Sequence, residues 1–148
     1  MSLLRYHPHR NPAPFILLLI LLTACSGGTD PGPSRADVSG TWLVTFSPNS
    51  SCTLSQMTLT LTQQGTVIHG TSGTVGISCP NTNPLVEPAQ TVVAGSVNGD
   101  AASVTLRSGS LGRYINGMVS VNTWTGTFGW GVSASTTVLT GTFTAQRQ

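Results

Sequence analysis

The stretch from Thr123 to Phe128 reads Thr-Trp-Thr-Gly-Thr-Phe, and it sets the pattern for most of the chain. Threonine alternates here with Trp124, Gly126 and Phe128, so hydroxyl side chains fall on one phase and apolar or small residues on the other. Alternation with period two is typical of a strand that buries one face. Threonine suits the outer face because its β-branched side chain fits a pleated sheet and its hydroxyl hydrates the surface without charge.

The same alternation recurs from Val38 onward, and no window shows the stripe of an amphipathic helix. Turn signals such as Gln64-Gly65 and Asn98-Gly99-Asp100 separate the alternating runs. The expected strands, eight or nine in number, span residues 40–47, 56–63, 66–71, 73–79, 91–97, 101–107, 113–120, 122–130 and 136–146. The sequence therefore predicts an all-β domain.

Glycine recurs on the inward phase of five of these strands, two residues after an apolar side chain. The five glycines are Gly70, Gly95, Gly117, Gly126 and Gly141. Because glycine weakens a strand, its repetition on one phase needs a structural reason. Missing side chains allow the sheet to coil sharply and leave room for a bulky neighbour such as Trp124 or Phe143. Both effects favour a small antiparallel up-and-down β-barrel, which also removes exposed strand edges. The inverse arrangement, a transmembrane barrel with threonine inside, is disfavoured because several strands are shorter than the roughly 9–11 residues needed to span a bilayer.

Residues 1–24 have the three regions of a signal peptide, with a basic start, an apolar run from Phe15 to Leu22 and small residues before Cys25. The apolar run is too short for a permanent transmembrane helix, which needs roughly 20 residues. Leu22-Thr-Ala-Cys25 resembles the lipobox of bacterial lipoproteins. The resemblance implies cleavage before Cys25 and attachment of fatty acyl chains, such as palmitate, to this residue. An ordinary secretory peptide with a chance cysteine is the alternative.

The lipobox resemblance implies an address in the bacterial cell envelope, with the membrane as a partner through lipid on Cys25. Ser26 after the cysteine implies sorting to the outer membrane, on its periplasmic face or the cell surface. Residues 25–37 form a Gly/Pro/Ser-rich linker without apolar periodicity. Residues 38–148 are expected to form the barrel domain.

Charge is scarce in this chain, with 7% charged residues and a formal net charge of +2. Arg5 and Arg10 account for that charge, so the mature protein is neutral and has no lysine. Nucleic acid is therefore excluded as a partner, because its recognition needs clustered cations. The mature chain has one histidine, His69, on an outward phase, and its acidic residues are scattered. We find no nucleophile motif, phosphate loop or paired carboxylates, so no enzyme activity and no cofactor are expected.

Cys52 and Cys79 remain as a pair once Cys25 is assigned to lipid, and envelope compartments allow disulfides to persist. We expect a disulfide that ties the loop after the first strand to the end of the fourth. A metal site is the rival interpretation, but two cysteines with only His69 nearby fall short of the usual ligand set.

Gly40-Thr-Trp42 on the first strand and Arg147 near the end of the last together resemble the calycin signature of lipocalins, fatty-acid-binding proteins and avidins. In an up-and-down barrel with an even number of strands the last strand pairs with the first, so Arg147 would cover the Trp42 indole. The alternative interpretation is that Gly40-Thr-Trp42 is one more copy of the glycine pattern and that Arg147 is a solvated residue near the C-terminus. Avidins have polar biotin ligands soon after this Gly-x-Trp motif. Here Leu43, Val44 and Thr45 include no matching asparagine, so the resemblance does not extend to biotin binding. The chain is also similar to small periplasmic barrels that inhibit metalloproteases.

The inward phase supplies the candidate residues for a ligand cavity, and they are aromatic. They are Trp42, Phe46, Trp124, Phe128 and Phe143. A small hydrophobic ligand would suit such a lining, although an eight-stranded barrel is only just wide enough for side chains to fill it.

Three features could instead form a contact surface for a protein. They are the 48–55 loop, the Pro80–Pro88 loop, and an outward set of Tyr114, Asn116 and Met118. The sequence thus predicts a lipid-anchored binding or interaction module, with a hydrolase inhibitor or a structural surface lipoprotein as alternatives.

Overall fold

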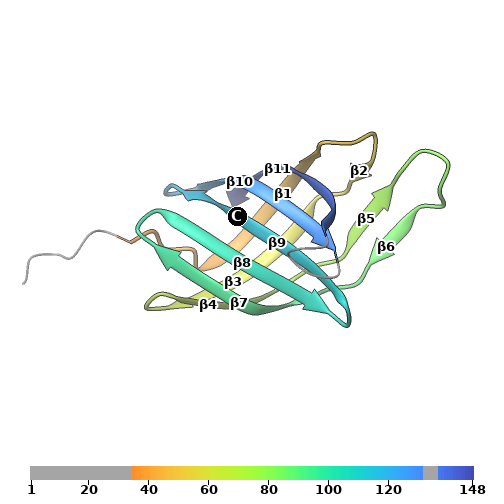
Figure 1. Cartoon of the computed structure of the whole chain (residues 1–148). Helices are drawn as coiled ribbons and strands as arrows, with labels where there is room; N and C mark the ends of the chain where they lie inside the picture. The colour runs from red at the N-terminus through yellow and green to blue at the C-terminus, as the bar shows by residue number, and fades with distance from the viewer. Residues whose placement is uncertain (1–34, 132–136) are drawn as a thin grey trace, which may run out of the picture. The chain divides into compact units, whose positions relative to one another are not determined.

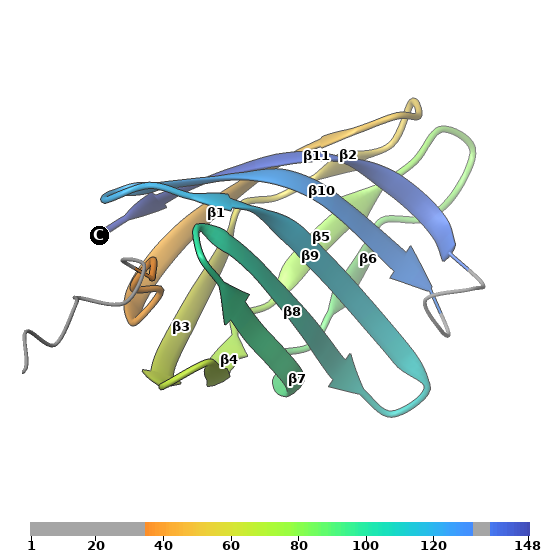
Figure 2. The same ribbon diagram turned by 60° about the vertical axis from the view of Figure 1, so that its left-hand side comes forward.

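The computed structural model describes residues 35–131 and 137–148, and its main body is a closed antiparallel barrel (Figure 1). Eight strands form the barrel: β1 (Gly40–Pro48), β3 (Met57–Gln64), β4 (Val67–Ser72), β7 (Thr91–Asn98), β8 (Ala101–Ser108), β9 (Leu111–Val119), β10 (Thr123–Gly131) and β11 (Thr137–Arg147). Each barrel strand pairs with the barrel strands before and after it along the chain, and β11 returns to β1 (Figure 2). The all-β, up-and-down barrel expected from the alternating sequence is confirmed.

The first and last strands close the barrel, and their pairing is antiparallel, as an even strand count requires of a closed up-and-down sheet. Trp42 on β1 lies opposite Arg147 on β11 and opposite Leu59 on β3. Phe46 and Phe143 form another cross-strand pair in the β1–β11 ladder. The predicted signal peptide, Cys25 and nearly all of the linker lie outside the described residues. Within the described part of the chain, no helix is long and apolar enough to cross a membrane.

The inward glycines mark the places where neighbouring backbones approach too closely for a side chain. Gly117 on β9 and Gly126 on β10 face each other across the ladder. A Cβ at Gly126 would overlap the Asn116 carbonyl oxygen and lie 2.5 Å from the Gly117 Cα. At Gly141 a Cβ would overlap a backbone oxygen and lie 2.7 Å from the Phe128 ring. Tight coiling of the sheet is therefore the main reason for the glycines, and space for an aromatic ring is a second reason at Gly141.

Aromatic rings fill the barrel interior. Trp42, Phe46, Trp124, Phe128 and Phe143 are all at most 8% exposed. Three edge-to-face pairs connect them: Trp42 with Trp124 at 6.2 Å between centroids, Trp124 with Phe143 at 5.4 Å, and Phe46 with Phe128 at 4.9 Å. These geometries are the preferred ones for aromatic pairs. The residues proposed to line a cavity therefore pack against one another as the core.

One of the nine expected strands lies outside the barrel, which corrects the prediction for residues 73–79. That segment forms β5 (Val75–Ser78), which pairs with β2 (Thr53–Leu54) and β6 (Leu85–Glu87) in a separate three-stranded sheet. The chain leaves the barrel after β4 and rejoins it at β7, which pairs directly with β4. Because β5 alternates like a barrel strand, its local pattern does not reveal which sheet it joins. Figures 1 and 2 show β2, β5 and β6 together at one end of the molecule.

The opposite end of the barrel, called here the closed end, is capped by the segment before β1. Ala36 donates its backbone N–H to the Gly99 carbonyl over 3.0 Å, and Val38 is fully buried. The Trp42 Nε1 donates to the Val38 carbonyl oxygen at 2.9 Å. The Arg147 guanidinium stacks over the Trp42 ring at 4.5 Å and donates to the backbone oxygen of Asp37. The structure thus places tryptophan and arginine together, at the geometry of a cation–π contact.

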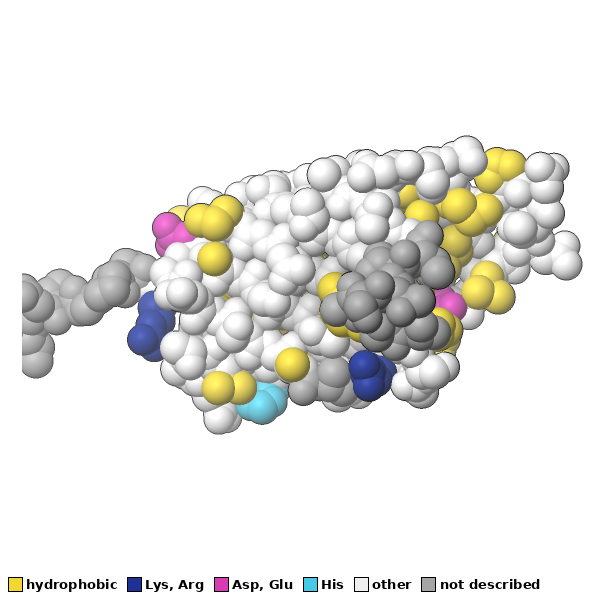
Figure 3. All heavy atoms as spheres, viewed as in Figure 1, with side chains coloured by type: hydrophobic (Ala, Val, Ile, Leu, Met, Phe, Trp, Pro, Cys, Tyr) yellow, Lys and Arg dark blue, Asp and Glu magenta, His cyan; other side chains and the backbone are white. Residues whose placement is uncertain are grey.

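The outer surface of the barrel is largely uncharged. Threonines on the outward phase are exposed, among them Thr58 and Thr60 on β3 and Thr142 and Thr144 on β11. His69 is exposed on β4, as its phase predicts. Figure 3 shows few charged side chains on one face, and a gathering of hydrophobic ones toward the end where β5 and β6 lie. That end holds the candidate site.

Candidate functional site

The mouth of the barrel, defined here as the end where β9 begins and β10 ends, carries an apolar pocket of about 350 Å³. The pocket lies where the three-stranded sheet meets β9, β10 and β11. This pocket is called here the mouth pocket. It is lined by Cys52, Ile77, Cys79, Leu85, Glu87, Leu111, Trp130 and Leu139. Seven of these eight side chains are apolar or sulfur-containing. The arrangement matches the usual character of small-molecule sites, which are mostly apolar with a few placed polar groups.

The disulfide forms part of the pocket wall. Cys52 precedes β2 and Cys79 follows β5, and the two are bonded with their Cα atoms 4.1 Å apart. The expected pairing is confirmed. The bond continues the ladder in which Thr53 pairs with Ser78. It therefore fixes two short strands that could not hold their position by themselves, because isolated pairs of short strands are marginal in water.

Glu87 is the single ionisable side chain of the mouth pocket. It is the last residue of β6, pairs with Val75, and is only 4% exposed. Its Oε2 atom is buried and has no hydrogen-bond partner among the described residues. Buried carboxylates are normally paired or hydrogen-bonded, because an unsatisfied charged group is costly. Glu87 thus carries a buried oxygen whose bonding capacity the described residues do not use.

Arg113 lies beneath the mouth pocket and is 1% exposed. Its guanidinium stacks on the Trp130 ring at 4.2 Å, a cation–π contact on a wall of the pocket. It donates to the Ser72 Oγ at 3.2 Å and to the Pro88 carbonyl oxygen at 3.5 Å. Burial lowers the pKa of Arg113 to about 10, and the nearby Glu87 carboxylate acts in the opposite direction. Arg113 is therefore protonated at neutral pH.

Ser72 and Gln90 extend the hydrogen-bond network of Arg113. The Ser72 Oγ accepts from the Gln90 backbone N–H at 3.2 Å and donates to the Gly73 carbonyl at 3.1 Å. The Ser72 N–H donates to the Gln90 carbonyl at 2.7 Å. Gln90 is 2% exposed, and neither atom of its side-chain amide has a partner within the described ranges. A group of buried polar side chains therefore lies next to Trp130, which is both a wall of the mouth pocket and part of the core.

Sequence reasoning placed the aromatic candidates correctly in the interior and paired Cys52 with Cys79, but it did not single out Arg113, Trp130 or Glu87 at the mouth. Two of the missed residues continue inward phases already visible in the sequence. Arg113 precedes Ile115 by two positions on β9, and Trp130 follows Phe128 by two on β10. Extending each alternation by one step would have found them. Glu87 has no such signal, because it lies in the Pro80–Pro88 loop, which was expected to form a contact surface and not a pocket wall.

The structure places the two predicted contact loops and the predicted outward set on β9 in different parts of the molecule. The 48–55 loop contains β2, and the Pro80–Pro88 loop contains β6. Asn116 is exposed, Met118 is 58% exposed, and Tyr114 is half-buried on the outer face. These three side chains lie on β9, away from the mouth-pocket lining. The structure therefore does not join the outward set and the two loops into one surface.

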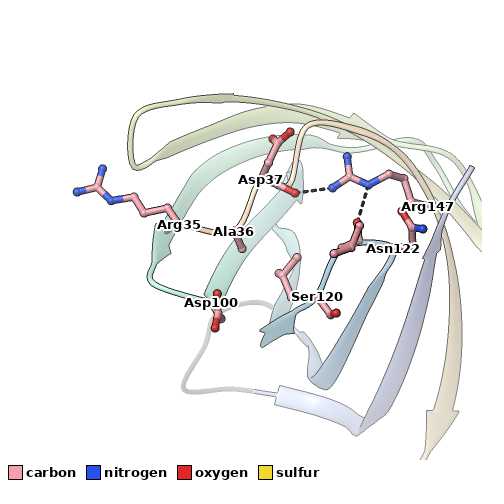
Figure 4. A pocket seen from close by; sticks show the side chains of 9 residues that line it. Arg35, Ala36, Asp37, Asp100, Ser120, Asn122 and Arg147 are labelled. Carbon is pink, nitrogen blue, oxygen red and sulfur yellow. Dashed lines mark hydrogen bonds between the residues drawn. The ribbon is translucent and has the colours of Figure 1, made fainter. Parts of the chain in front are cut away.

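The closed end has a larger and more open hollow, of about 700 Å³, shown in Figure 4. It is bordered by the segment from Arg35 to Asp37 and by the turns that carry Asp100 and Asn122. Arg147 in its lining bonds to backbone groups of the protein itself. Arg147 donates from Nε to the Val121 carbonyl at 3.2 Å and from its backbone N–H to the Asn122 carbonyl at 3.0 Å. Arg147 in this hollow thus serves the cap, whereas the mouth pocket is lined mainly by apolar side chains.

Metal ligation has no support in the described ranges, where no three His, Cys, Asp or Glu side chains gather to hold an ion. Comparison of the chain with protein-family models, with curated proteins and with solved structures finds no match. The mouth pocket is therefore the feature of this molecule that bears on its function.

Proposed function

We propose that this protein is a lipid-anchored binding module of the bacterial cell envelope, and that it takes a small hydrophobic ligand at the mouth of its barrel. The observation that carries the proposal is the mouth pocket, an apolar cavity of about 350 Å³. Cavities of roughly 300–1,000 Å³ are the usual size for small-molecule sites. An apolar cavity of about 150 Å³ is enough for benzene, so this pocket suits a molecule of about two rings.

The location of the pocket supports a ligand over a packing defect. The aromatic core fills the interior below it, and the three-stranded sheet extends over it from outside the barrel. Leu85 at its edge is 55% exposed and the adjacent Val86 is 71% exposed. An exposed apolar rim around an apolar hollow is a feature of binding grooves.

The envelope location and the lipid anchor depend on the lipobox resemblance at Leu22–Cys25. Two or three acyl chains would hold the protein stably on a membrane, whereas one chain binds only marginally. Mass spectrometry of protein purified from native membranes tests this part. We expect a mature chain that begins at Cys25 and carries acyl mass. An unacylated mature N-terminus at any other residue would refute the anchor without affecting the pocket.

Titration with biphenyl tests ligand binding, with two-dimensional NMR of the labelled protein as the readout. We expect saturable shifts at residues of the mouth pocket, and loss of those shifts in Leu111→Trp, which places an indole in the cavity. Met118→Trp is the matched control, because Met118 is 58% exposed on the same strand and does not line the pocket. Equal binding by both variants, or shifts confined to other residues, would contradict the proposed site.

The inhibitor alternative requires an N-terminal segment that can enter a protease. Residues 36 to 38 do not supply such a segment, because Ala36 and Val38 are held against the barrel by backbone hydrogen bonds and burial. An inhibitory arm would therefore have to precede Arg35. The mouth pocket favours the ligand-binding function as the primary proposal.

A further inference from the structure

Exposed apolar side chains gather at the closed end of the barrel. Val121, in the turn between β9 and β10, is 81% exposed, the highest value among the exposed large hydrophobic residues of the described ranges. Val67 at the start of β4 is 46% exposed, and Met118 near the end of β9 is 58% exposed. The up-and-down order brings all three to the same end, because every second connection of such a barrel lies there. A group of this kind marks a contact surface more often than scattered exposed residues do.

The charges at the closed end balance one another. Arg35 and Arg147 supply two positive charges to the lining of its hollow, and Asp37 and Asp100 supply two negative ones. The side chains of Arg35 and Asp100 are exposed, and Figure 4 shows the Arg35 side chain extending away from the hollow. A zwitterionic phospholipid headgroup carries the complementary pair, a phosphate for a guanidinium and an ammonium for a carboxylate. The absence of net charge in this lining gives no particular attraction to anionic lipid.

The chain enters the described part of the protein at this same end. Arg35 borders the hollow, and the Ala36 N–H bonds to the Gly99 carbonyl there. Cys25, the proposed site of lipid attachment, precedes Arg35 by ten positions, and a chain of that length reaches at most about 35 Å. Lipid on Cys25 would therefore keep the closed end close to a bilayer. A surface contact that is weak by itself becomes populated when a tether makes it intramolecular.

We infer that the closed end is a membrane-docking surface, and that its partner is the zwitterionic phospholipid bilayer that holds the lipid on Cys25. This inference rests on the lipid anchor of the proposed function. Val67, Met118 and Val121 enter the boundary between headgroups and acyl chains. Arg35 and Asp100 contact the headgroups. The mouth pocket then faces away from this bilayer, so that its ligand arrives from the aqueous side.

Methyl NMR of the acylated mature protein in phosphatidylcholine nanodiscs tests the orientation, with a gadolinium-chelating lipid as the paramagnetic probe. Val67 and Val121 report on the closed end, and Leu85 and Val86, which are 55% and 71% exposed, report on the mouth. The mouth lies roughly 20 Å farther along the nine-residue strand β9, so broadening at the closed end should exceed that at the mouth at least about tenfold. A water-soluble gadolinium chelate should broaden the mouth signals more strongly.

Two surface variants locate the contact. Val121→Asp replaces an apolar side chain with a charged one, and it should lower the ratio of docked to undocked protein roughly threefold to tenfold, read from the broadening of Val67. Val86→Asp is the matched control, because it makes the same change at an exposed position of the mouth. It should leave the broadening unchanged. An increase in salt from about 50 mM to about 500 mM should also have little effect, because the contact depends on apolar insertion.

The outcomes separate the docking surface from the anchor. If acylated protein shows equal broadening at the two ends, or stronger broadening at the mouth, the docking inference is wrong and the anchor stands. Equal effects of Val121→Asp and Val86→Asp, or loss of the broadening at high salt, would also overturn it. The comparison of the two ends in the wild type needs no variant. If mass spectrometry finds no acyl chain on Cys25, the anchor and the docking inference both fail, and the mouth pocket is unaffected.

Discussion

Gly126 offers the sharpest test of how the barrel is built, because a single methyl group should disturb two strands. A Cβ at this position would overlap the Asn116 carbonyl oxygen and lie 2.5 Å from the Gly117 Cα and 2.8 Å from the Asn116 carbonyl carbon. All three atoms belong to the backbone of β9, so no side chain can rotate away. In Gly126→Ala, β9 and β10 must therefore separate or lose their tight coil.

The expected cost follows from two opposing effects. Overpacking a well-packed interior costs about 1–3 kcal/mol, and a contact with backbone lies at the upper end of that range. Replacing glycine with alanine also stiffens the unfolded chain and returns about 0.4–1 kcal/mol. The net loss for Gly126→Ala should be about 2 kcal/mol. For a domain of this size that loss corresponds to a Tm lower by about 10 °C.

Gly76→Ala is the matched control. A Cβ at Gly76 would lie 3.6 Å from the Ser55 Oγ and 3.7 Å from the Ser55 Cβ, which is ordinary contact. This variant should match the wild-type Tm or exceed it by a few degrees, because only the unfolded-state effect operates. Thermal unfolding of both variants, followed by circular dichroism with the disulfide intact, gives the comparison. If Gly126→Ala unfolds within about 2 °C of Gly76→Ala, the sheet tolerates a methyl group there and the coiling argument is wrong.

Three further predictions concern the disulfide, the closed end of the barrel and the stability of the protein in acid. Cys52→Ala should lower the free energy of unfolding by about 3–4 kcal/mol, since the bond closes a 27-residue separation, and denaturant unfolding of the reduced wild type should reproduce that loss. Arg147→Met should lower stability by about 1–3 kcal/mol through loss of the stacking on Trp42 and of hydrogen bonds to backbone carbonyls, and a normal Tm would contradict the capping role. The pKa of Asp37 is lowered by hydrogen bonds from the Ser39 backbone and hydroxyl, so its contribution to stability is present above the unfolded pKa and is lost as pH falls through the lower folded pKa. Urea unfolding between pH 5 and pH 2 should therefore show a steeper acid loss in the wild type than in Asp37→Asn, and parallel curves would refute it.

The barrel could be predicted from the sequence because its strands carry a local signal. Alternation in runs such as Met57–Leu61 and Ala102–Leu106 identifies which side chains point inward, and the structure buries them. Closure of an up-and-down barrel pairs the first strand with the last, and with an even number of strands that pair is antiparallel. Both inferences need only the period of the pattern and the connectivity of an up-and-down sheet.

The three-stranded sheet could not be predicted in the same way, because its strands are short and their partners are set by tertiary contacts. β2 has two residues and β6 has three, both too short to show a period. β5 alternates well enough to pass for a barrel strand. What separates it from the barrel is the direct pairing of β4 with β7, which no local pattern announces.

The division between core and site follows from the size of the barrel. Eight strands enclose a space that side chains can fill, and here Trp124, Phe143 and their neighbours fill it. A ligand site in such a barrel must be built at an end, with wall material from outside the eight strands. The segment between β4 and β7, which contains β5 and β6, supplies that wall. The Cys52–Cys79 bond ties this segment to the loop after β1.

The disulfide should therefore matter more to binding than its distance from the aromatic core suggests. Reduction would release β2 from β5 and remove the wall that carries Ile77 and Leu85, while the closed end keeps its cap of Val38 and Trp42. Under reducing conditions in which the barrel is still folded by near-UV circular dichroism, we expect biphenyl affinity to fall at least about tenfold. Retained affinity in the folded, reduced protein would contradict this prediction. It would show that strand pairing alone holds β5 and β6 in place as a wall of the pocket.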